Sequence, residues 1–424
     1  MTQAVCVDVG STYTKACLVD LGGGGLVART EVPTTAATDV LTGLDAAVSS
    51  LPGSGELHVC SSAGGGLRLA VVGYERLVTA SAGHRVGLSA GATVVHVAAG
   101  LLDGRSVSSL KASRPDVILL VGGTDGGDGD VLLHNARRLA TSRLRRPVVV
   151  AGNSSVAADA AALLTGRGLP VTVTGNVLPR IGVLDPGPAR AAIREVFLRH
   201  VIGGKRLSRG PRFASLVRAA TPDAVLAGVE VLAGHSTEGV LLIDVGGATT
   251  DVYSALVPDA EEETGPRRDV AGTLWRMRTV EGDLGVAVSA PGTAAAAAAE
   301  RLPLRDPGDP VALASAAATI AVRRHARGRA LRDVRLVIGS GGVLRHGGGD
   351  AVLDAVLGDL AGGWAPPDRA RRMIDKDYVL AAAGLLSAEH PQAAAGLLSG
   401  SGLSQVRGGG GEVGRGVNRS GTAG

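Results

Sequence analysis

The sequence predicts an α/β protein built from two similar lobes. Strand and helix patterns alternate along most of the 424 residues, as they do in α/β domains. The motif D-V-G-x-x-x-T occurs at residues 8–14 and again at residues 244–250, about half the chain apart. Because internal repeats indicate repeated structural units, the two copies predict two lobes that face each other.

The first half is expected to begin with a meander of three strands. Residues 4–9 form a short apolar strand, residues 10–12 turn the chain, and residues 13–19 continue as a second strand. A break precedes the third strand at residues 26–31. Nearly continuous apolar runs then predict buried strands, with helical patterns among them. These strands are expected at residues 117–121, 147–150 and 170–174, and the helices at 155–164 and 188–201.

The second half is expected to repeat the meander. Its elements are strands at residues 240–245, 251–257, 273–280 and 336–338, helices at 294–301, 312–327 and 377–386, and a loop at 259–268. From residue 396 onward large apolar residues nearly vanish, which is typical of disorder. We therefore predict a first lobe at residues 1–225, a second at 226–395, and a disordered Gly-rich tail at 396–424.

Composition narrows the class of protein. Apolar residues make up 45% of the chain and aromatic residues 2%, and the formal net charge is +4. The basic run at residues 323–335 is interpreted as a solvated helix face. Nucleic-acid binding requires a basic stripe with stacking aromatics, so no nucleic-acid partner is expected. No signal peptide is recognisable, and no apolar stretch reaches the ~20 residues of a membrane span, so we expect a cytoplasmic protein without a membrane partner.

Cysteine and histidine give no metal signal. The three cysteines form no CxxC pair, which excludes a cysteine-rich metal site and fits a reducing compartment. Cys60 is interpreted as a buried thiol. Five dispersed histidines without metal-ligand spacing are assigned structural or surface roles. They are His84, His96, His134, His235 and His346.

Each copy of the repeated motif is expected at the turn between two strands. Glycine lets the backbone approach a phosphate closely, and successive N–H groups form an anion-binding concavity, to which hydroxyl groups add further donors. The phosphate-binding residues are predicted to be Gly10, Ser11, Thr12 and Thr14 in the first hairpin, and Gly246, Gly247, Ala248, Thr249 and Thr250 in the second. A glycine pair alone does not indicate phosphate binding here, because 64 residues are Gly and such pairs are expected by chance. The alternative interpretation is two ordinary hairpins.

Asp8 and Asp244 each end an apolar strand, so their carboxylates are expected to point into the cleft between the lobes. Mg²⁺ prefers oxygen ligands and keeps most of its waters, so both aspartates are expected to hold Mg²⁺ largely through water. Lys15 is placed to bring a positive charge to the phosphates, but its place on a strand equally allows it to face outward. Asp251 is interpreted as a brace of its own hairpin.

A third glycine-rich turn follows the strand at residues 336–338. Such a turn lets an adenosine lie against the backbone. The turn indicates adenosine binding mainly because it follows two phosphate hairpins in the sequence. It consists of Gly339, Ser340, Gly341 and Gly342. A Walker-type ATPase is excluded, because GxxxxGK[ST] does not occur in the sequence.

In this order the three motifs resemble the phosphate-1, phosphate-2 and adenosine motifs of the actin, sugar-kinase and DnaK superfamily. The resemblance implies an ATPase with two ribonuclease-H-like lobes, ATP and Mg²⁺ in the cleft between them, and an inserted α/β region in the first half. Ala248 departs from the pattern, since chaperones of this class usually carry a third glycine there. The effect is expected to be small because alanine is the next smallest residue.

Other segments resemble the MutL-type accessory proteins of glutamate mutase, over roughly residues 3–390. The segments are residues 119–127, 150–153, 176–184, 191–197, 280–285 and 339–344. This resemblance implies a reactivating chaperone for an adenosylcobalamin-dependent mutase, which uses ATP to loosen the mutase so that damaged cobalamin leaves. It implies no cobalamin site on this chain, which lacks the D-x-H-x-x-G pattern.

Two more aspartates are candidate residues of the ATP site. Asp125 follows the strand at residues 117–121 and would orient the attacking water, as connecting-segment acids do in the superfamily; an ordinary loop aspartate is the other interpretation. Asp283 is placed to reach the phosphates from the second lobe.

Two alternative functions use the same scaffold. A small-molecule kinase would need a polar substrate pocket and a positioned base. A non-catalytic or filament-forming scaffold would bind ATP without turnover.

Overall fold

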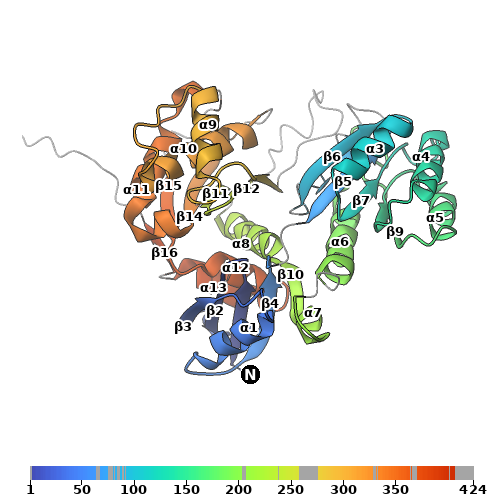
Figure 1. The fold of residues 1–424 in the computed structure, drawn as a ribbon. Helices are drawn as coiled ribbons and strands as arrows, with labels where there is room; N and C mark the ends of the chain where they lie inside the picture. Colours follow the sequence, from blue (N-terminus) through green and yellow to red (C-terminus); the bar gives the residue numbers. More distant parts are fainter. Residues whose placement is uncertain are drawn as a thin grey trace, which may run out of the picture.

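The computed structural model describes residues 2–63, 67–74, 92–202, 207–236, 238–256, 276–327, 333–362, 370–400 and 402–405, with residues 80, 82–83, 86–87, 90, 331 and 364. Within this part of the chain the strands form three sheets (Figure 1). Two of them are the cores of the two lobes, and the third belongs to a domain inserted into the first lobe.

The first lobe contains a five-stranded sheet in the order β10-β4-β1-β2-β3. Strands β1 (Gln3–Val9), β2 (Tyr13–Asp20) and β3 (Leu26–Pro33) form the expected antiparallel meander. Strands β4 (Glu56–Ser61) and β10 (Val217–Ala220) extend the sheet in parallel to β1. Helix α1 (Val40–Ser49) packs on this sheet, and its N-cap Asp39 accepts a hydrogen bond from the Leu41 N–H.

The second lobe repeats this topology in a six-stranded sheet, β13-β12-β11-β14-β15-β16. The antiparallel meander consists of β11 (Gly239–Val245), β12 (Thr250–Ala255) and β13 (Arg276–Glu281). Strands β14 (Val334–Ser340) and β15 (Arg371–Asp375) follow in parallel, and β16 (Leu403–Gln405) pairs antiparallel with β15. The helices of this lobe are α9 (Ala290–Ala299), α10 (Pro310–His325) and α11 (Gly349–Leu357). Two lobes with the same meander-plus-parallel order confirm the predicted fold class.

The inserted domain lies between β4 and β10 in the sequence. Its parallel sheet has the order β6-β5-β7-β8-β9, the doubly wound 2-1-3-4-5 arrangement. The strands are β5 (Arg68–Gly73), β6 (Thr93–Ala99), β7 (Val117–Leu120), β8 (Val148–Val150) and β9 (Val171–Val173). Its helices are α3 (Gly104–Ala112), α4 (Asp130–Thr141), α5 (Ala157–Thr165) and α6 (Gly187–Val196), whereas the short helix α7 (Arg212–Leu216) packs against β4 and β10 of the first lobe.

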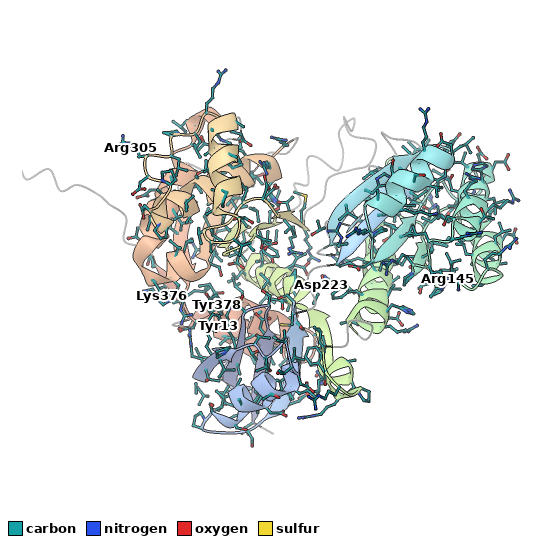
Figure 2. The ribbon with its side chains drawn as sticks, viewed as in Figure 1. Tyr13, Arg145, Asp223, Arg305, Lys376 and Tyr378 are labelled. Carbon is teal, nitrogen blue, oxygen red and sulfur yellow. The ribbon has the colours of Figure 1, made fainter. Side chains whose placement is uncertain are left out.

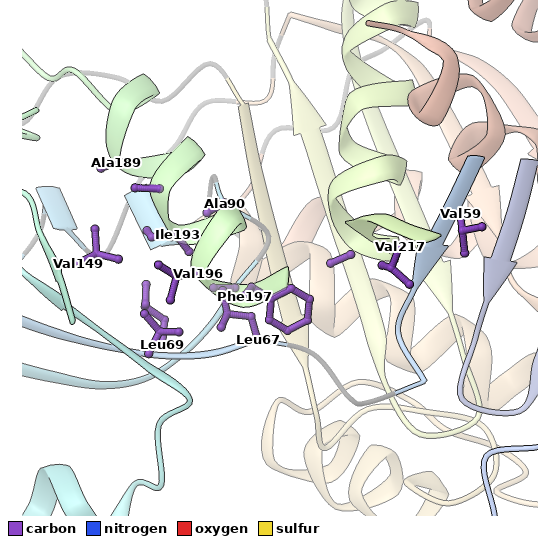
Figure 3. Packing of buried hydrophobic residues seen from close by; sticks show 14 of the residues in the cluster. Val59, Leu67, Leu69, Ala90, Val149, Ala189, Ile193, Val196, Phe197 and Val217 are labelled. Carbon is purple, nitrogen blue, oxygen red and sulfur yellow. The ribbon is translucent and has the colours of Figure 1, made fainter. Parts of the chain in front are cut away.

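One continuous core joins the inserted domain to the first lobe (Figure 3). Phe197, at the end of α6, is buried in the same cluster as Leu67 of the inserted domain and Val217 and Val59 of the first lobe. The inserted domain is therefore packed onto the first lobe as well as tethered to it.

Helices α8 (Thr221–Ser236), α12 (Val379–Leu386) and α13 (Pro391–Ser399) lie between the two lobes (Figure 1). They share an apolar cluster with Cys6 of the first sheet and Leu242 of the second. Where α8 and α12 meet, a Cβ added at Gly228 would overlap the Leu380 carbonyl, and one added at Gly384 would overlap the Ala224 carbonyl. The two helices thus touch backbone to backbone. Among the described residues, no helix combines the length and apolarity that crossing a membrane requires.

Two expectations are wrong in part. Residues 396–400 and 402–405 do not belong to a disordered tail, because α13 extends to Ser399 and β16 completes the second sheet; residues 406–424 lie outside the described part. The basic run is not simply a solvated face. Arg323 binds Asp359 through two hydrogen bonds of 2.7 Å, and Arg324 binds Glu281 at 2.7 Å, because the end of α10 packs against acidic neighbours.

Candidate nucleotide site

The first hairpin places a carboxylate and a lysine on one face of the sheet. Asp8 lies directly opposite Lys15 in the β1–β2 ladder, and residues opposite each other share a face. Lys15 therefore faces inward. Asp8 Oδ1 also accepts hydrogen bonds from Thr221 Oγ1, at the start of α8, and from Cys60 Sγ at 3.7 Å. Burial raises the pKa of Asp8, while Lys15, Thr221 and Cys60 favour its ionised form. Cys60 is the buried thiol expected from the sequence.

The second hairpin places Asp244 in the equivalent position. It lies opposite Asp251 on β12 and beside Ser340 on β14, whose hydroxyl donates to it. Burial, with the neighbouring Asp251, raises the pKa of Asp244 to about 6, although the charge of Lys15 opposes the shift. Asp251 itself is paired with the buried Arg278 at 2.6 Å, so it does brace its hairpin. Because Lys15 acts on both Asp8 and Asp244, the two hairpins face a common cation.

Asp375 is a site residue that sequence reasoning missed. It ends β15, is 2% exposed, and accepts a hydrogen bond from the Val379 N–H at 2.9 Å, so it fixes the start of α12. Burial raises its pKa to about 7, and the nearby Asp244 contributes to the shift. The sequence did contain a signal for Asp375, because this residue ends a strand as Asp8 does. A helical pattern follows it instead of a glycine turn.

Tyr378 closes the site from the side of α12. The Lys15 Nζ atom lies 3.6 Å from the centroid of the Tyr378 ring, and the Arg345 guanidinium lies 4.9 Å from it. Arg345, on the second lobe, also pairs with Glu31 on β3 at 3.2 Å. Figure 2 labels Tyr378 where the first and second lobes meet. Cation–π contacts and an ion pair therefore join the lobes beside the lysine.

The predicted phosphate-binding hydroxyls fall into two groups. Ser11 and Thr12 are exposed at the first turn. Thr14 and Thr250 are fully buried on the opposite face, where Thr14 bonds to the Thr34 hydroxyl at 2.9 Å and Thr250 donates to the Leu284 carbonyl at 3.1 Å. Side chains alternate along a strand, so neither threonine shares a face with the aspartate of its hairpin. Both threonines stabilise their hairpins through these bonds and lie on the face opposite the two aspartates.

The backbone carbonyls of the second turn accept hydrogen bonds from the segment at residues 286–289. The N–H groups of Val286 and Ala287 donate to the carbonyls of Gly246 and Gly247 at 3.1 and 2.9 Å. The Ser289 hydroxyl donates to the Ala248 carbonyl at 2.6 Å. Thr249 donates to Asp251 at 3.3 Å.

The third turn lies against the end of β11. Gly341 has φ +104°, and a Cβ there would overlap the Val245 carbonyl, so the position requires glycine. Gly339 packs against Leu344 and Ile374, and Gly342 is open. The Ser340 hydroxyl is hydrogen-bonded to Asp244. Adenosine binding at this turn remains a prediction.

Asp283 and Asp125 lie in different places. Asp283 belongs to the segment that covers the second hairpin, and both of its carboxylate oxygens accept from Arg324, at 3.0 and 3.1 Å. Asp125 lies in the inserted domain, where Oδ1 accepts from the Ser154 N–H and from Asn176, both at 2.9 Å. The structure does not bring Asp125 together with Asp8 and Asp244. Its strand was recognised correctly, but that strand belongs to the inserted sheet.

The chain leaves the first lobe for the inserted domain along the first hairpin. Directly after β4, the Ser61 hydroxyl and the N–H groups of Ser62 and Ala63 all donate to the Val9 carbonyl, at 3.0, 3.0 and 3.1 Å. Val9 follows Asp8 and begins the turn. The exit segment is therefore fastened to the phosphate hairpin itself.

The Asp375 carboxyl predicts a pH dependence of stability. Its pKa of about 7 in the folded state exceeds the ~3.9 of an unfolded chain, so the native state binds the extra proton. This contribution to stability is therefore full below about pH 4 and is lost as pH rises towards 7, by roughly 4 kcal/mol. Asp375→Asn keeps the helix cap without the ionisation. Urea unfolding at pH 5 and pH 8, without nucleotide, is expected to show a smaller fall for this variant; equal falls would contradict the assignment.

Two ribonuclease-H-like lobes, each with an aspartate hairpin turned to a shared lysine, define a protein of the two-lobed actin-like class. The sequence profile of the family described as "MutL protein" matches residues 4–321 and 309–401. Protein MutL of Clostridium tetanomorphum is 33% identical over 452 residues, covering 93% of this chain and 98% of that protein. The chain belongs to the MutL family, as the resemblance in the sequence predicted.

Solved structures with a similar fold are more distant. The ATP-dependent caprolactamase from Pseudomonas jessenii is 14% identical, with TM-score 0.39 over 90% of this chain and 70% of that one. An activator of 2-hydroxyisocaproyl-CoA dehydratase from Clostridium difficile, solved with bound ADPNP, is 10% identical, with TM-score 0.32 over 92% of this chain and 95% of that one.

Proposed function

We propose that this protein binds ATP with Mg²⁺ between the two hairpins and hydrolyses it, and that it uses this cycle to reactivate an adenosylcobalamin-dependent mutase, of which glutamate mutase is the first candidate. The observation that carries the ATP site is the convergence of Asp8 and Asp244, from two separate lobes, on Lys15. The partner is proposed from membership of the MutL family.

The charges at the site fit a divalent cation. The site contains three carboxyls, and burial raises the pKa of each. They belong to Asp8, Asp244 and Asp375, whose charges also shift the pKa of one another or of Lys15. Three carboxyls with one lysine leave negative charge that a bound cation would compensate, and carboxylate oxygens are ligands that Mg²⁺ accepts, often through water. Asp8 and Asp244 would hold the ion, which would neutralise charge on the phosphates.

The remaining groups position the nucleotide. The Lys15 ammonium lies over the Tyr378 ring and interacts electrostatically with both aspartates, a position from which it would attract the phosphates. Thr221 and Cys60 hold the Asp8 carboxylate in one orientation. Ser340 does the same for Asp244. We assign no residue to activation of the attacking water, because Asp125 has its contacts within the inserted domain.

A nucleotide can reposition the lobes only through different affinities for their two arrangements. The Arg345–Glu31 ion pair and the Lys15–Tyr378–Arg345 stack join the lobes next to the phosphates. ATP competes with Tyr378 for Lys15, so binding would loosen one of these contacts. This competition is our candidate for the link between nucleotide state and lobe position.

The proposed function is tested by reactivation. Purified protein is mixed with glutamate mutase carrying inactivated cobalamin, and recovery of mutase activity is followed after fresh adenosylcobalamin is added, with and without ATP. We expect recovery that requires ATP and is lost with Asp244→Asn. Hydrolysis without recovery would leave the ATP site intact and rule out this mutase as the partner. Absence of hydrolysis in every condition would refute the ATPase assignment.

A further inference from the structure

A second cluster of ionisable side chains lies at the opposite end of β4 from Asp8. Glu56 and His58 are two residues apart on β4, so their side chains share a face of the sheet. Glu389 and His390 lie in the connection between α12 and α13. One ligand atom from each of these four residues lies within 4.8 Å of all the others. His58 and His390 meet edge to face, with ring centroids 6.1 Å apart.

His58 contributes a buried nitrogen that lacks a partner. Its side chain is 0% exposed, and Nε2 has no hydrogen-bond partner among the described residues. Glu56 Oε1 is 3.4 Å away, but that approach does not have the geometry of a hydrogen bond. An unsatisfied buried nitrogen destabilises a fold and calls for an explanation. The carboxylate of Glu56 lies near this nitrogen and is also 3.4 Å from His390 Nε2, so both imidazoles lie beside one carboxylate.

The cluster carries uncompensated negative charge. Two carboxylates, Glu56 and Glu389, are held together by a single guanidinium, that of Arg218. Arg218 donates to Glu389 Oε1 at 2.9 Å and to Glu56 Oε1 at 3.4 Å, and its NH1 contacts His58 Nδ1 at 2.9 Å. With neutral histidines, one negative charge remains among these side chains. The arrangement attracts a further cation.

We propose that Glu56, His58, Glu389 and His390 form a binding site for a divalent transition-metal ion, with Zn²⁺ as the best match. Two imidazoles and two carboxylates supply four N and O ligands, the number and kind that a tetrahedral zinc site uses. Bond lengths of about 2.0–2.2 Å require the four atoms to draw closer together. Glu389 and His390 lie between two helices, with side chains 52% and 29% exposed, so they have room to move towards β4.

Arg218 competes with the metal for this site. Its guanidinium donates towards His58 Nδ1, which leaves the proton of a neutral ring on Nε2. Metal binding through Nε2 therefore requires Arg218 to leave Nδ1, so that the proton moves there. The Arg218 side chain is 42% exposed and can turn to solvent. Arg218 acts as a substitute cation in the metal-free protein.

A bound ion would fasten the α12–α13 connection to β4. Helix α12 begins beside Asp375 and Tyr378 at the nucleotide site and ends before Glu389, so the metal would fix its far end against the first lobe. The inference does not depend on the proposed function, because the cluster shares no residue with the nucleotide site.

The test is metal binding by nucleotide-free, Mg²⁺-free protein. Zn²⁺ is titrated by calorimetry, and Co²⁺ is added as a spectroscopic probe whose visible d–d absorption reports coordination. We expect one Zn²⁺ per chain. Glu56→Gln and His390→Ala are expected to weaken binding by ~100-fold or more, and Arg218→Gln to strengthen it several-fold because the competing cation is gone. His200→Ala, at an exposed histidine of the π-helical turn (Phe197–Ile202), is the matched control and should bind as the wild type does.

Several outcomes would overturn the site. One is no Zn²⁺ binding in either the wild type or Arg218→Gln. Another is equal binding in Glu56→Gln, His390→Ala and the control. A near-ultraviolet thiolate-to-cobalt band would place the metal on a cysteine instead. The tested residues are partly exposed, and circular dichroism verifies that each variant is folded, so loss of binding reports the ligand.

Discussion

Replacing Asp244 with Asn is expected to abolish ATP hydrolysis and leave the fold intact. The amide keeps the size of the side chain but removes the charge that would hold the cation, and an interaction worth several kcal/mol to the transition state corresponds to a loss of about 100-fold or more in rate. Folding should not suffer, since burial already disfavours the charged carboxylate, as its raised pKa of about 6 indicates. Steady-state phosphate release measures the rate, and thermal unfolding measures the stability.

The matched control for this variant is Asp350→Asn, an exposed aspartate in the first turn of α11 on the same lobe. It makes the same chemical change away from the hairpins and should hydrolyse ATP at the wild-type rate. Asp8→Asn should behave as Asp244→Asn does. Wild-type turnover in purified, folded Asp244→Asn would exclude the two-hairpin site.

Replacing Gly384 with Ala is expected to lower the free energy of unfolding by about 3 kcal/mol or more, at the upper end of what overpacking costs. The added Cβ would overlap the Ala224 carbonyl, which is backbone of α8 and cannot rotate away. The two helices would have to separate, and the apolar cluster between the lobes would separate with them. Urea unfolding gives the change in free energy.

Gly234→Ala is the matched control, because Gly234 lies on α8 with no atom within 4 Å of the added Cβ. Alanine is the better helix former, so this variant should be stabilised by up to about 1 kcal/mol. If Gly384→Ala and Gly234→Ala were equally stable, the helices would not be in backbone contact. Loss of activity in Gly384→Ala at a temperature where it remains folded would show that the helix crossing also matters to the reaction.

The hairpins could be predicted from sequence because their signal is local. Asp8 and Asp244 each end an apolar strand and precede a glycine turn, and both meanders form where the pattern placed them. The orientation of Lys15 was left open, since it depends on the β1–β2 register; the structure pairs Lys15 with Asp8. For Thr14 and Thr250, the motif spacing indicated phosphate contact, but strand alternation turns both to the buried face.

Other features depend on which distant segments become neighbours. Thr221 and Asp8 are 213 residues apart, and their hydrogen bond arises only because β10 returns beside β4 after the inserted domain. The proposed metal site likewise combines two pairs of residues from distant parts of the chain, Glu56 with His58 and Glu389 with His390, which the helices between the lobes bring together. Neither histidine could be recognised in the sequence, because His58 and His390 are far apart in the chain and form no local metal-ligand spacing. Asp125 shows the reverse case, in which a correct local pattern belongs to a different sheet.

The three hydrogen bonds that the exit segment makes to the Val9 carbonyl have a consequence for any partner of the inserted domain. A rigid displacement of that domain must either stretch these bonds or carry the first turn with it. Linkage is reciprocal: if a partner that holds the domain in a new position changes the affinity for nucleotide, then nucleotide changes the affinity for that partner by the same factor. The three hydrogen bonds on the Val9 carbonyl oxygen would then couple the binding of the partner to the binding of nucleotide.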